Sequence, residues 1–341
     1  MKYISKGLLF FLVSALIFFS LSCFSECIAA NKIKFATVAP KGSIWVKCME
    51  DLDRRLRSKS KGKIGFSIYA GGIAGDEIDV LKKIRIGQLH CAAFSGVGIT
   101  EILPMWRVLD LPFMFRNIDE VKAVHAELKK LFTDEFRKQG FEYLSWAEVG
   151  DVHLFSQKEI SSRDDLKGLK IWTWSGDPVS KKTFTVMGSS PIPLSITDVT
   201  TSINTKMIDT VYAPPVGALS MQWYDGMKYM TALPITHSTG AILISKSYFD
   251  KIPRELAELL QHEVKISMAR LAVDLDNQTK ESIEIIKSKG LKIIPVPENE
   301  ELGRFYDINL KVSEDLKENV YPENLLRRVN SILESIRNKK Q

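Results

Sequence analysis

The sequence predicts an α/β protein with two lobes, mixed but mainly parallel sheets, and one long helix that crosses both lobes. Strand-like and helix-like segments alternate through residues 33–94 with short glycine-containing joints, a pattern typical of a parallel sheet with right-handed crossovers. A second alternating set begins at residue 170. Residues 253–289 have apolar residues at helical spacing and no internal proline or glycine. A helix of that length extends about 50 Å, farther than one small domain, so we expect it to cross two.

The first thirty residues read as a secretory signal that lies outside this fold. A basic start, MKYISK, precedes the apolar run GLLFFLVSALIFFSLS, which is too short to predict a membrane-spanning helix. Cleavage after Ala30 is the first interpretation, and lipid attachment at Cys23, which would tether the chain to a membrane, is the alternative. Both interpretations place the mature protein outside the cytoplasm.

The composition excludes several classes of protein. Of the 341 residues, 45% are apolar and 26% are charged, which is ordinary for a globular chain and excludes disorder. The formal charge of +6 is spread along predicted helices and no nucleic-acid-binding motif occurs, so no nucleic-acid partner is expected. Only Cys48 and Cys91 remain after the leader. Their spacing matches no zinc site and predicts buried thiols rather than a disulfide.

The first alternating set contains three strands and two helices. The strands are predicted over residues 33–38, 64–69 and 89–94. Ser43 is placed to cap the first helix, and Gly87 follows the end of the second. A longer helix over residues 118–138 comes next, with Asn117 as its N-cap.

The second set follows two further strands, near residues 143–146 and 153–156. It comprises a strand over 170–174, a helix after Asp177-Pro178, a helix opened by Ser195-Ile196-Thr197-Asp198, and a strand over 210–212. We therefore assign residues 31–149 and 238–277 to lobe 1, and residues 150–237 and 278–341 to lobe 2.

Several short motifs occur in a fixed order along the chain. They are Gly42-Ser43, Gly71-Gly72-Ile73-Ala74-Gly75-Asp76, Ile86-Gly87-Gln88-Leu89, Leu109-Asp110-Leu111-Pro112-Phe113-Met114-Phe115, Asp164-Asp165-Leu166-Lys167-Gly168-Leu169-Lys170-Ile171 and Trp223-Tyr224. With this order and spacing, nearly all of residues 31–330 resembles the substrate-binding proteins of tripartite ATP-independent periplasmic (TRAP) transporters of the DctP type.

The resemblance implies a two-lobed periplasmic binding protein fold. It also implies that the lobes close over a small-molecule ligand, which is then delivered to membrane permease subunits driven by an ion gradient. We expect a periplasmic monomer with no cofactor and no metal.

Three positions depart from the pattern of the family. The family typically has an arginine where this chain has Trp172, and a second basic residue where this chain has Val152. Its Glu-Asn-Pro segment, whose asparagine contacts the ligand, aligns with Tyr212-Ala213-Pro214. Burying a carboxylate without its counter-charge costs several kcal/mol, whereas burying an indole contributes about 1.5–3 kcal/mol. These departures therefore predict a neutral, substantially apolar ligand.

The predicted ligand-binding residues follow from these departures and from strand ends near the cleft. In a strand, Trp172 and Trp174 point to one face, at the end where α/β crevices collect ligands; the alternative is that both are core residues. The complete set is Trp172, Trp174, Tyr212, Ala213, Pro214, Trp223, Trp146, Val152 and Trp45, with Ser43, Asp76, Ser95 and Asp151 as polar candidates.

Catalysis has little support in the sequence. No HExxH pair and no nucleophile elbow occur, and the glycines at 71, 72 and 75 lack the spacing of a phosphate-binding loop. We therefore expect a binding protein and not an enzyme. Two alternatives remain: a carboxylate binder that uses a cation or other basic groups, such as Lys41 or His153, and an exported hydrolase or lyase that uses Asp151 and His153.

Overall fold

The computed structural model describes residues 31–339, except for the side chain of Asn299. The predicted signal peptide and the alternative lipid site at Cys23 lie outside the described residues. No helix within residues 31–339 is long and apolar enough to cross a membrane.

The chain alternates strands and helices, as the sequence predicted. Its first part contains β1 (Asn31–Ala36), α2 (Ile44–Lys59), β2 (Ile64–Tyr69), α3 (Glu77–Arg85), β3 (Cys91–Ser95), α4 (Gly96–Thr100), the 3-10 helix η1 (Pro104–Asp110) and α5 (Ile118–Lys138). The next part contains β4 (Phe141–Ser156), η2 (Arg163–Leu166), β5 (Lys170–Trp174), α6 (Pro178–Val186), β6 (Ser190–Leu194), η3 (Ile196–Asp198), α7 (Val199–Asn204), β7 (Thr210–Ala213), α8 (Pro215–Ser220) and η4 (Trp223–Gly226). The last part contains β8 (Tyr229–Thr231), β9 (Thr236–Ser245), α9 (Lys246–Phe249), α10 (Arg254–Ser288), β10 (Lys292–Ile294), α11 (Asn299–Leu316) and α12 (Glu323–Asn338).

The strands form one continuous mixed sheet. Its order is β2-β1-β3-β9-β4-β7-β5-β6, and β8 pairs with both β4 and β10. Strand β1 pairs in parallel with β2 and β3, and β5 pairs in parallel with β6 and β7. Every antiparallel pair involves β4 or β9. The predicted α/β fold with a mixed, mainly parallel sheet is confirmed.

Strand β4 joins the two halves of the sheet. We predicted separate strands near 143–146 and 153–156, but a single strand covers both segments. Its pairing with β9 is irregular between Glu148 and Gly150, where Gly150 has a φ of 112° that favours glycine. The bulge lets one strand continue through the segment between the two predicted strands.

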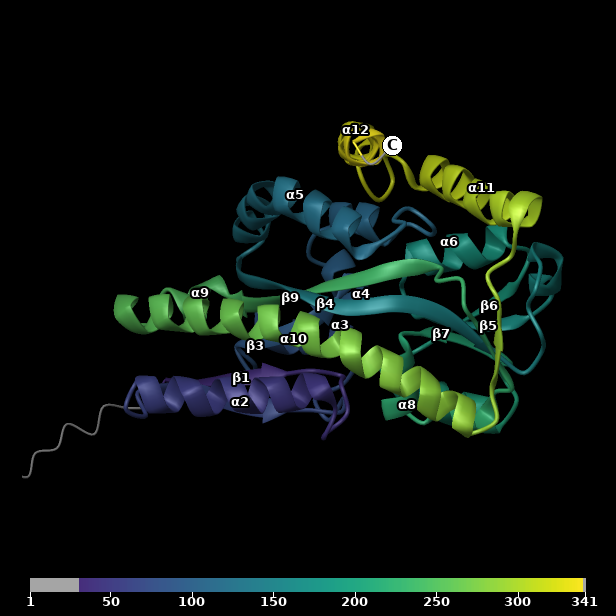
Figure 1. Ribbon diagram of the computed structural model, residues 1–341. Coiled ribbons are helices and arrows are strands. Elements are labelled where there is room, and N and C mark those ends of the chain that lie inside the picture. The colour runs from purple at the N-terminus through teal and green to yellow at the C-terminus, as the bar shows by residue number, and fades with distance from the viewer. Residues whose placement is uncertain (1–30, 340–341) are drawn as a thin grey trace, which may run out of the picture.

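Helix α10 crosses the whole molecule, as predicted. It contains 35 residues and runs past both halves of the sheet in Figure 1. Leu260 near its start and Leu271 at its middle pack in a cluster with α2 and β1, while Ile286 near its end packs with Trp172 of β5. One rigid element therefore contacts the cores of both halves.

The C-terminal helix contacts the first part of the chain. Helix α12 packs against α5, and Arg337 pairs with Glu120 at 2.8 Å. Our division into lobes, which stays a prediction, assigned these two helices to different lobes. The contact therefore ties the C-terminal helix back to lobe 1.

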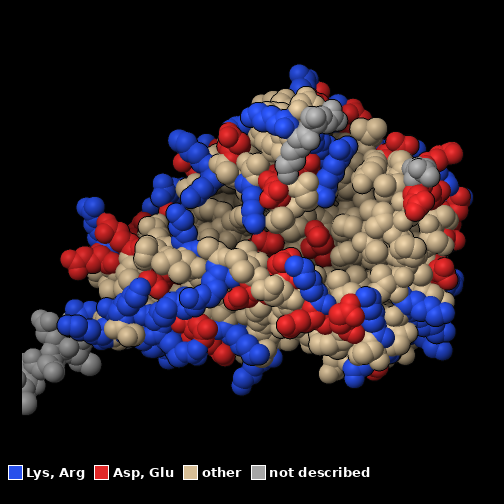
Figure 2. Space-filling model, in the orientation of Figure 1, with Lys and Arg blue, Asp and Glu red and all other residues tan. Residues whose placement is uncertain are grey.

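The cysteines and the charged surface agree with the sequence analysis. Cys48 and Cys91 are free thiols, as predicted, but only Cys91 is fully buried; Cys48 is half-buried, and burial raises its pKa to about 11. On the face in Figure 2, lysine and arginine side chains are interspersed with aspartate and glutamate.

The packing of α10 predicts a large effect of truncating its buried face. Leu271 is 1% exposed, so Leu271→Ala should lower the free energy of unfolding by about 2–5 kcal/mol because it leaves a cavity. Val273 on the same helix is 64% exposed, and Val273→Ala should change the free energy of unfolding by less than about 0.5 kcal/mol. Chemical denaturation of both variants checks this, and similar losses would contradict the packing described.

Candidate functional site

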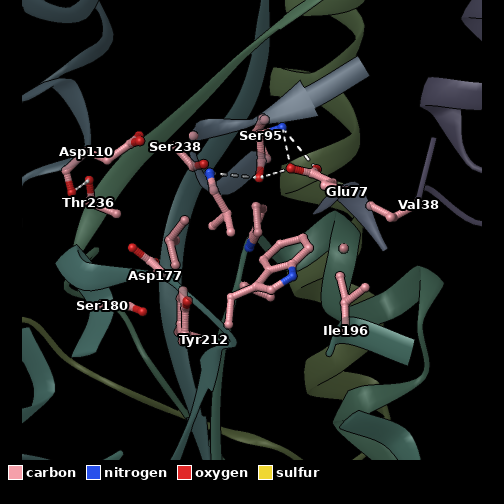
Figure 3. A pocket seen from close by; sticks show the side chains of 18 of the residues that line it. Val38, Glu77, Ser95, Asp110, Asp177, Ser180, Ile196, Tyr212, Thr236 and Ser238 are labelled. Atoms are coloured by element: carbon pink, nitrogen blue, oxygen red, sulfur yellow. Dashed lines mark hydrogen bonds between the residues drawn. The ribbon is translucent and has the colours of Figure 1, made fainter. Parts of the chain in front are cut away.

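A cavity of about 220 Å³ lies between residues of the two predicted lobes. Lobe 1 contributes η1 and the segment after β1, and lobe 2 contributes β5, α6 and β7. Most of the predicted ligand-binding residues line it: Ser43, Trp45, Ser95, Val152, Trp172, Trp174, Tyr212, Ala213, Pro214 and Trp223. Figure 3 shows the lining side chains converging on the cavity.

Aromatic rings form one wall of this pocket. Trp172 stacks on Tyr212 with ring centroids 5.0 Å apart, and Trp223 meets it edge-on at 5.1 Å. The indole N–H of Trp172 donates to the carbonyl oxygen of Leu194 at 3.2 Å. Trp172 is only 2% exposed and belongs to a hydrophobic cluster. Trp172 is therefore a core residue that also lines the pocket, and its contact with a ligand stays a prediction.

Two of the predicted residues of β4 lie outside the pocket lining, Trp146 because side chains alternate along the strand and Asp151 because the bulge between Glu148 and Gly150 shifts that alternation, so that Val152 lines the cavity instead. Ala147 and Val149 face the cavity, so Trp146 points to the opposite face of the strand, where it stacks on His125 at 4.5 Å. Asp151 instead bonds to Nδ1 of His237 at 2.7 Å.

Asp76, a third predicted residue, also lies outside the lining and connects the lobes. Its carboxylate accepts bonds from the indole N–H of Trp174 at 2.9 Å, the Ser195 hydroxyl at 2.6 Å and the Ile196 amide at 3.2 Å. It also caps α3 through the amide of Glu77. Asp76 thus fixes a pocket indole and joins residues of the two predicted lobes.

The sequence analysis missed a buried ionic cluster in the pocket wall. Arg107 Nη2 lies 2.8 Å from Asp177 Oδ1, and Arg107 Nε lies 3.3 Å from Asp110 Oδ2. All three side chains are at least nine-tenths buried. Gly96 makes this approach feasible, because a Cβ there would overlap Asp110 Oδ2. An arginine and an aspartate three residues apart in the apolar stretch Trp106–Phe113 were the signal that could have revealed the cluster.

The remaining acid of the pocket is Glu77 on the other side of the cavity. Its carboxylate accepts from the Ser95 amide at 3.0 Å, the Ser95 hydroxyl at 2.9 Å and the Gly98 amide at 2.8 Å. Burial raises the pKa of Glu77 to about 7 despite these bonds. Among the described residues that line the pocket, Arg107 is the single basic side chain against the acids Glu77, Asp110 and Asp177.

Comparison with known proteins identifies the family. The family described as bacterial extracellular solute-binding protein, family 7 (DctP), matches residues 35–318 of this chain. The chain belongs to this family. Its members include TRAP solute-binding proteins, which are periplasmic, bind small molecules and work with membrane permease subunits.

Individual relatives support the assignment. The chain is 25% identical over 289 residues to the 2,3-diketo-L-gulonate-binding periplasmic protein YiaO of Escherichia coli, covering 82% of this chain and 86% of YiaO. A TRAP solute-binding protein of Pseudomonas putida with bound D-glucuronate is 24% identical, with a TM-score of 0.81 over 88% of this chain and 96% of that one. The sugar acid binding protein DctPAm of Advenella mimigardefordensis, in complex with galactonate, is 21% identical. It has a TM-score of 0.85 and covers 90% of this chain and 98% of DctPAm.

The ligands named for these relatives correct one prediction. They are acids, and they contradict the neutral or hydrophobic ligand that we predicted for this DctP protein. That prediction relied on the missing polar groups at Trp172, at Val152 and in the segment Tyr212-Ala213-Pro214. It left out Arg107, which comes from another part of the chain.

The contacts of Asp76 predict a role in closure. Asp76→Ala should lower the free energy of unfolding by about 1–3 kcal/mol, since charged hydrogen bonds and a helix cap are lost, and should raise the radius of gyration. Asp79→Ala, on the exposed face of the same helix, is the matched control. Chemical denaturation and small-angle scattering measure both quantities, and an Asp76 variant that matches its control would refute the role.

Proposed function

We propose that this TRAP solute-binding protein captures a small organic acid with a single carboxylate and delivers it to the permease. The observation that carries the proposal is Arg107, the one basic side chain among the described residues that line the pocket. A guanidinium has five N–H donors, so it retains donors for a ligand carboxylate after forming its two ion pairs.

The rest of the pocket supports a single carboxylate rather than two. Glu77 lies on the side of the cavity opposite Asp177, so a second carboxylate would approach an acid and not a base. The carbon skeleton of the acid would pack on the rings of Trp172 and Tyr212, which supply apolar area.

The basic groups suggested from the sequence do not replace Arg107. Lys41 and His153 are not among the lining residues, and His153 Nδ1 lies 2.9 Å from the carbonyl oxygen of Thr231. The same contacts offer no support for the hydrolase or lyase alternative, since Asp151 and His153 are both outside the pocket. We further propose that the protein acts as a monomer, because one chain supplies every wall of the cavity.

A panel of acids tests the proposal. Benzoate, phenylacetate and 3-phenyllactate should bind at least tenfold more tightly than succinate, whose second carboxylate meets no basic group. They should also bind more tightly than D-glucuronate, which has one carboxylate but whose hydroxyl groups would be buried against the aromatic wall. The tryptophans of the pocket provide the fluorescence signal, and calorimetry gives the affinities.

Variants locate the carboxylate in the pocket. Arg107→Gln should weaken binding by about 100-fold, whereas Arg85→Gln on the surface should leave it unchanged. Folding of the variants is checked by circular dichroism. Tighter binding of the dicarboxylate, or no binding of any acid, would refute the proposed function.

A further inference from the structure

One wall of the pocket holds an unusual concentration of buried polar atoms without hydrogen-bond partners. They are Asp110 Oδ1, the Ser180 hydroxyl, the Tyr212 hydroxyl, and the pair Arg107 Nε and Asp110 Oδ2, which lie 3.3 Å apart as an ion pair without the geometry of a hydrogen bond. Figure 3 shows Asp110, Asp177, Ser180 and Tyr212 on the same side of the cavity. Buried polar groups in proteins are normally paired, so a ligand that enters this pocket is expected to satisfy several of these atoms.

The charges of this wall do not balance. Asp177 is committed to Arg107 at 2.8 Å and neutralises its charge. Asp110, 7% exposed, adds a second negative charge 3.3 Å from the same guanidinium. A carboxylate that binds to Arg107 would therefore lie beside Asp110, and two carboxylates that share a buried site cannot both stay ionised at low cost.

We propose that Asp110 determines specificity for a carboxylate by taking up a proton when the acid binds and donating it in a hydrogen bond to the ligand. This inference rests on the proposed function. One proton passes from the solvent to Asp110 on binding and returns to the solvent on release, and no covalent bond of the ligand changes. The hydrogen bond between a carboxylic acid and a carboxylate is short and strong, so the repulsive pair becomes an attractive one.

The surroundings of Asp110 favour this protonation. Burial is the main cause that raises the pKa of Asp110, and the charge of Asp177 acts in the same direction; with all its neighbours present the pKa is about 6. Arg107, the Thr239 amide and His237 act in the opposite direction and keep the carboxyl mostly ionised at neutral pH while the pocket is empty. A ligand carboxylate adds a negative charge, which must raise the pKa again.

The sign of the pH dependence follows from these two states. Below about pH 6, Asp110 is already protonated in the free protein, so the affinity for a fully ionised acid is constant. Above that pH, each rise of one pH unit lowers the affinity by up to about tenfold, because Asp110 must take up a proton when the ligand binds. The decline ends at the higher pKa of the bound state.

Glu77 is the other titrating acid of the pocket and provides a matched comparison. Its carboxylate already accepts bonds from Ser95 and Gly98, and it lies across the cavity from the arginine cluster. A carboxylate bound to Arg107 should therefore leave the protonation of Glu77 unchanged. The inference predicts that proton uptake persists in Glu77→Gln and disappears in Asp110→Asn.

Calorimetry at pH 7 in buffers of different ionisation enthalpy measures the protons taken up. The probe is whichever of benzoate, phenylacetate and 3-phenyllactate binds most tightly, and affinities are then followed from pH 5.5 to 8.5. The wild-type protein should take up about one proton per ligand. Asp110→Asn should bind with no uptake and no decline above pH 6. At pH 8 it should bind more tightly than the wild type, because its amide donates without a proton.

Several results would overturn the inference. Binding without proton uptake, or uptake that is lost in Glu77→Gln and kept in Asp110→Asn, contradicts the role of Asp110. Tighter binding of phenylalanine than of 3-phenyllactate without uptake would mean that a ligand ammonium group balances Asp110, which leaves the proposed function intact. Absence of binding by every acid refutes the proposed function itself. If Asp110→Asn does not fold, the uptake and pH profile of the wild type decide the question.

Discussion

The buried ion pair between Arg107 and Asp177 determines what this pocket can accept. Arg107 comes from η1 and Asp177 from the start of α6, in the two predicted lobes, so their contact at 2.8 Å joins the two sides of the pocket. Buried charges are costly to desolvate, and leaving either partner alone would be expensive. The pair therefore joins the two sides of the pocket at the place where we propose that the ligand carboxylate binds.

The rest of the fold supports this contact from both sides. Strands β4 and β9 and helix α10 run through both halves, so the lobes share a continuous scaffold. Asp76 bonds to Trp174 and Ser195 across the cleft and places the aromatic wall against lobe 1. Aromatic surface and a single arginine are thus presented together, which suits an acid whose skeleton is less polar than its carboxylate.

Much of the fold and part of the site could be predicted from the sequence, for identifiable reasons. The long helix followed from uninterrupted apolar spacing, and Trp172 and Tyr212 followed from strand ends and from alignment with a family. Arg107 could not be found in this way, because its partner Asp177 is 70 positions away and only tertiary structure brings them together. The sequence prediction counted the basic groups missing at Trp172 and Val152 and did not count Arg107. It therefore gave the wrong ligand polarity.

A crystal structure of the protein with the ligand that co-purifies with it tests the central claim most directly. The account predicts electron density for a small acid between the lobes, with its carboxylate in contact with the guanidinium of Arg107 and its skeleton against Trp172. A ligand whose polar group lies away from Arg107, or a ligand without an acid group, would contradict it.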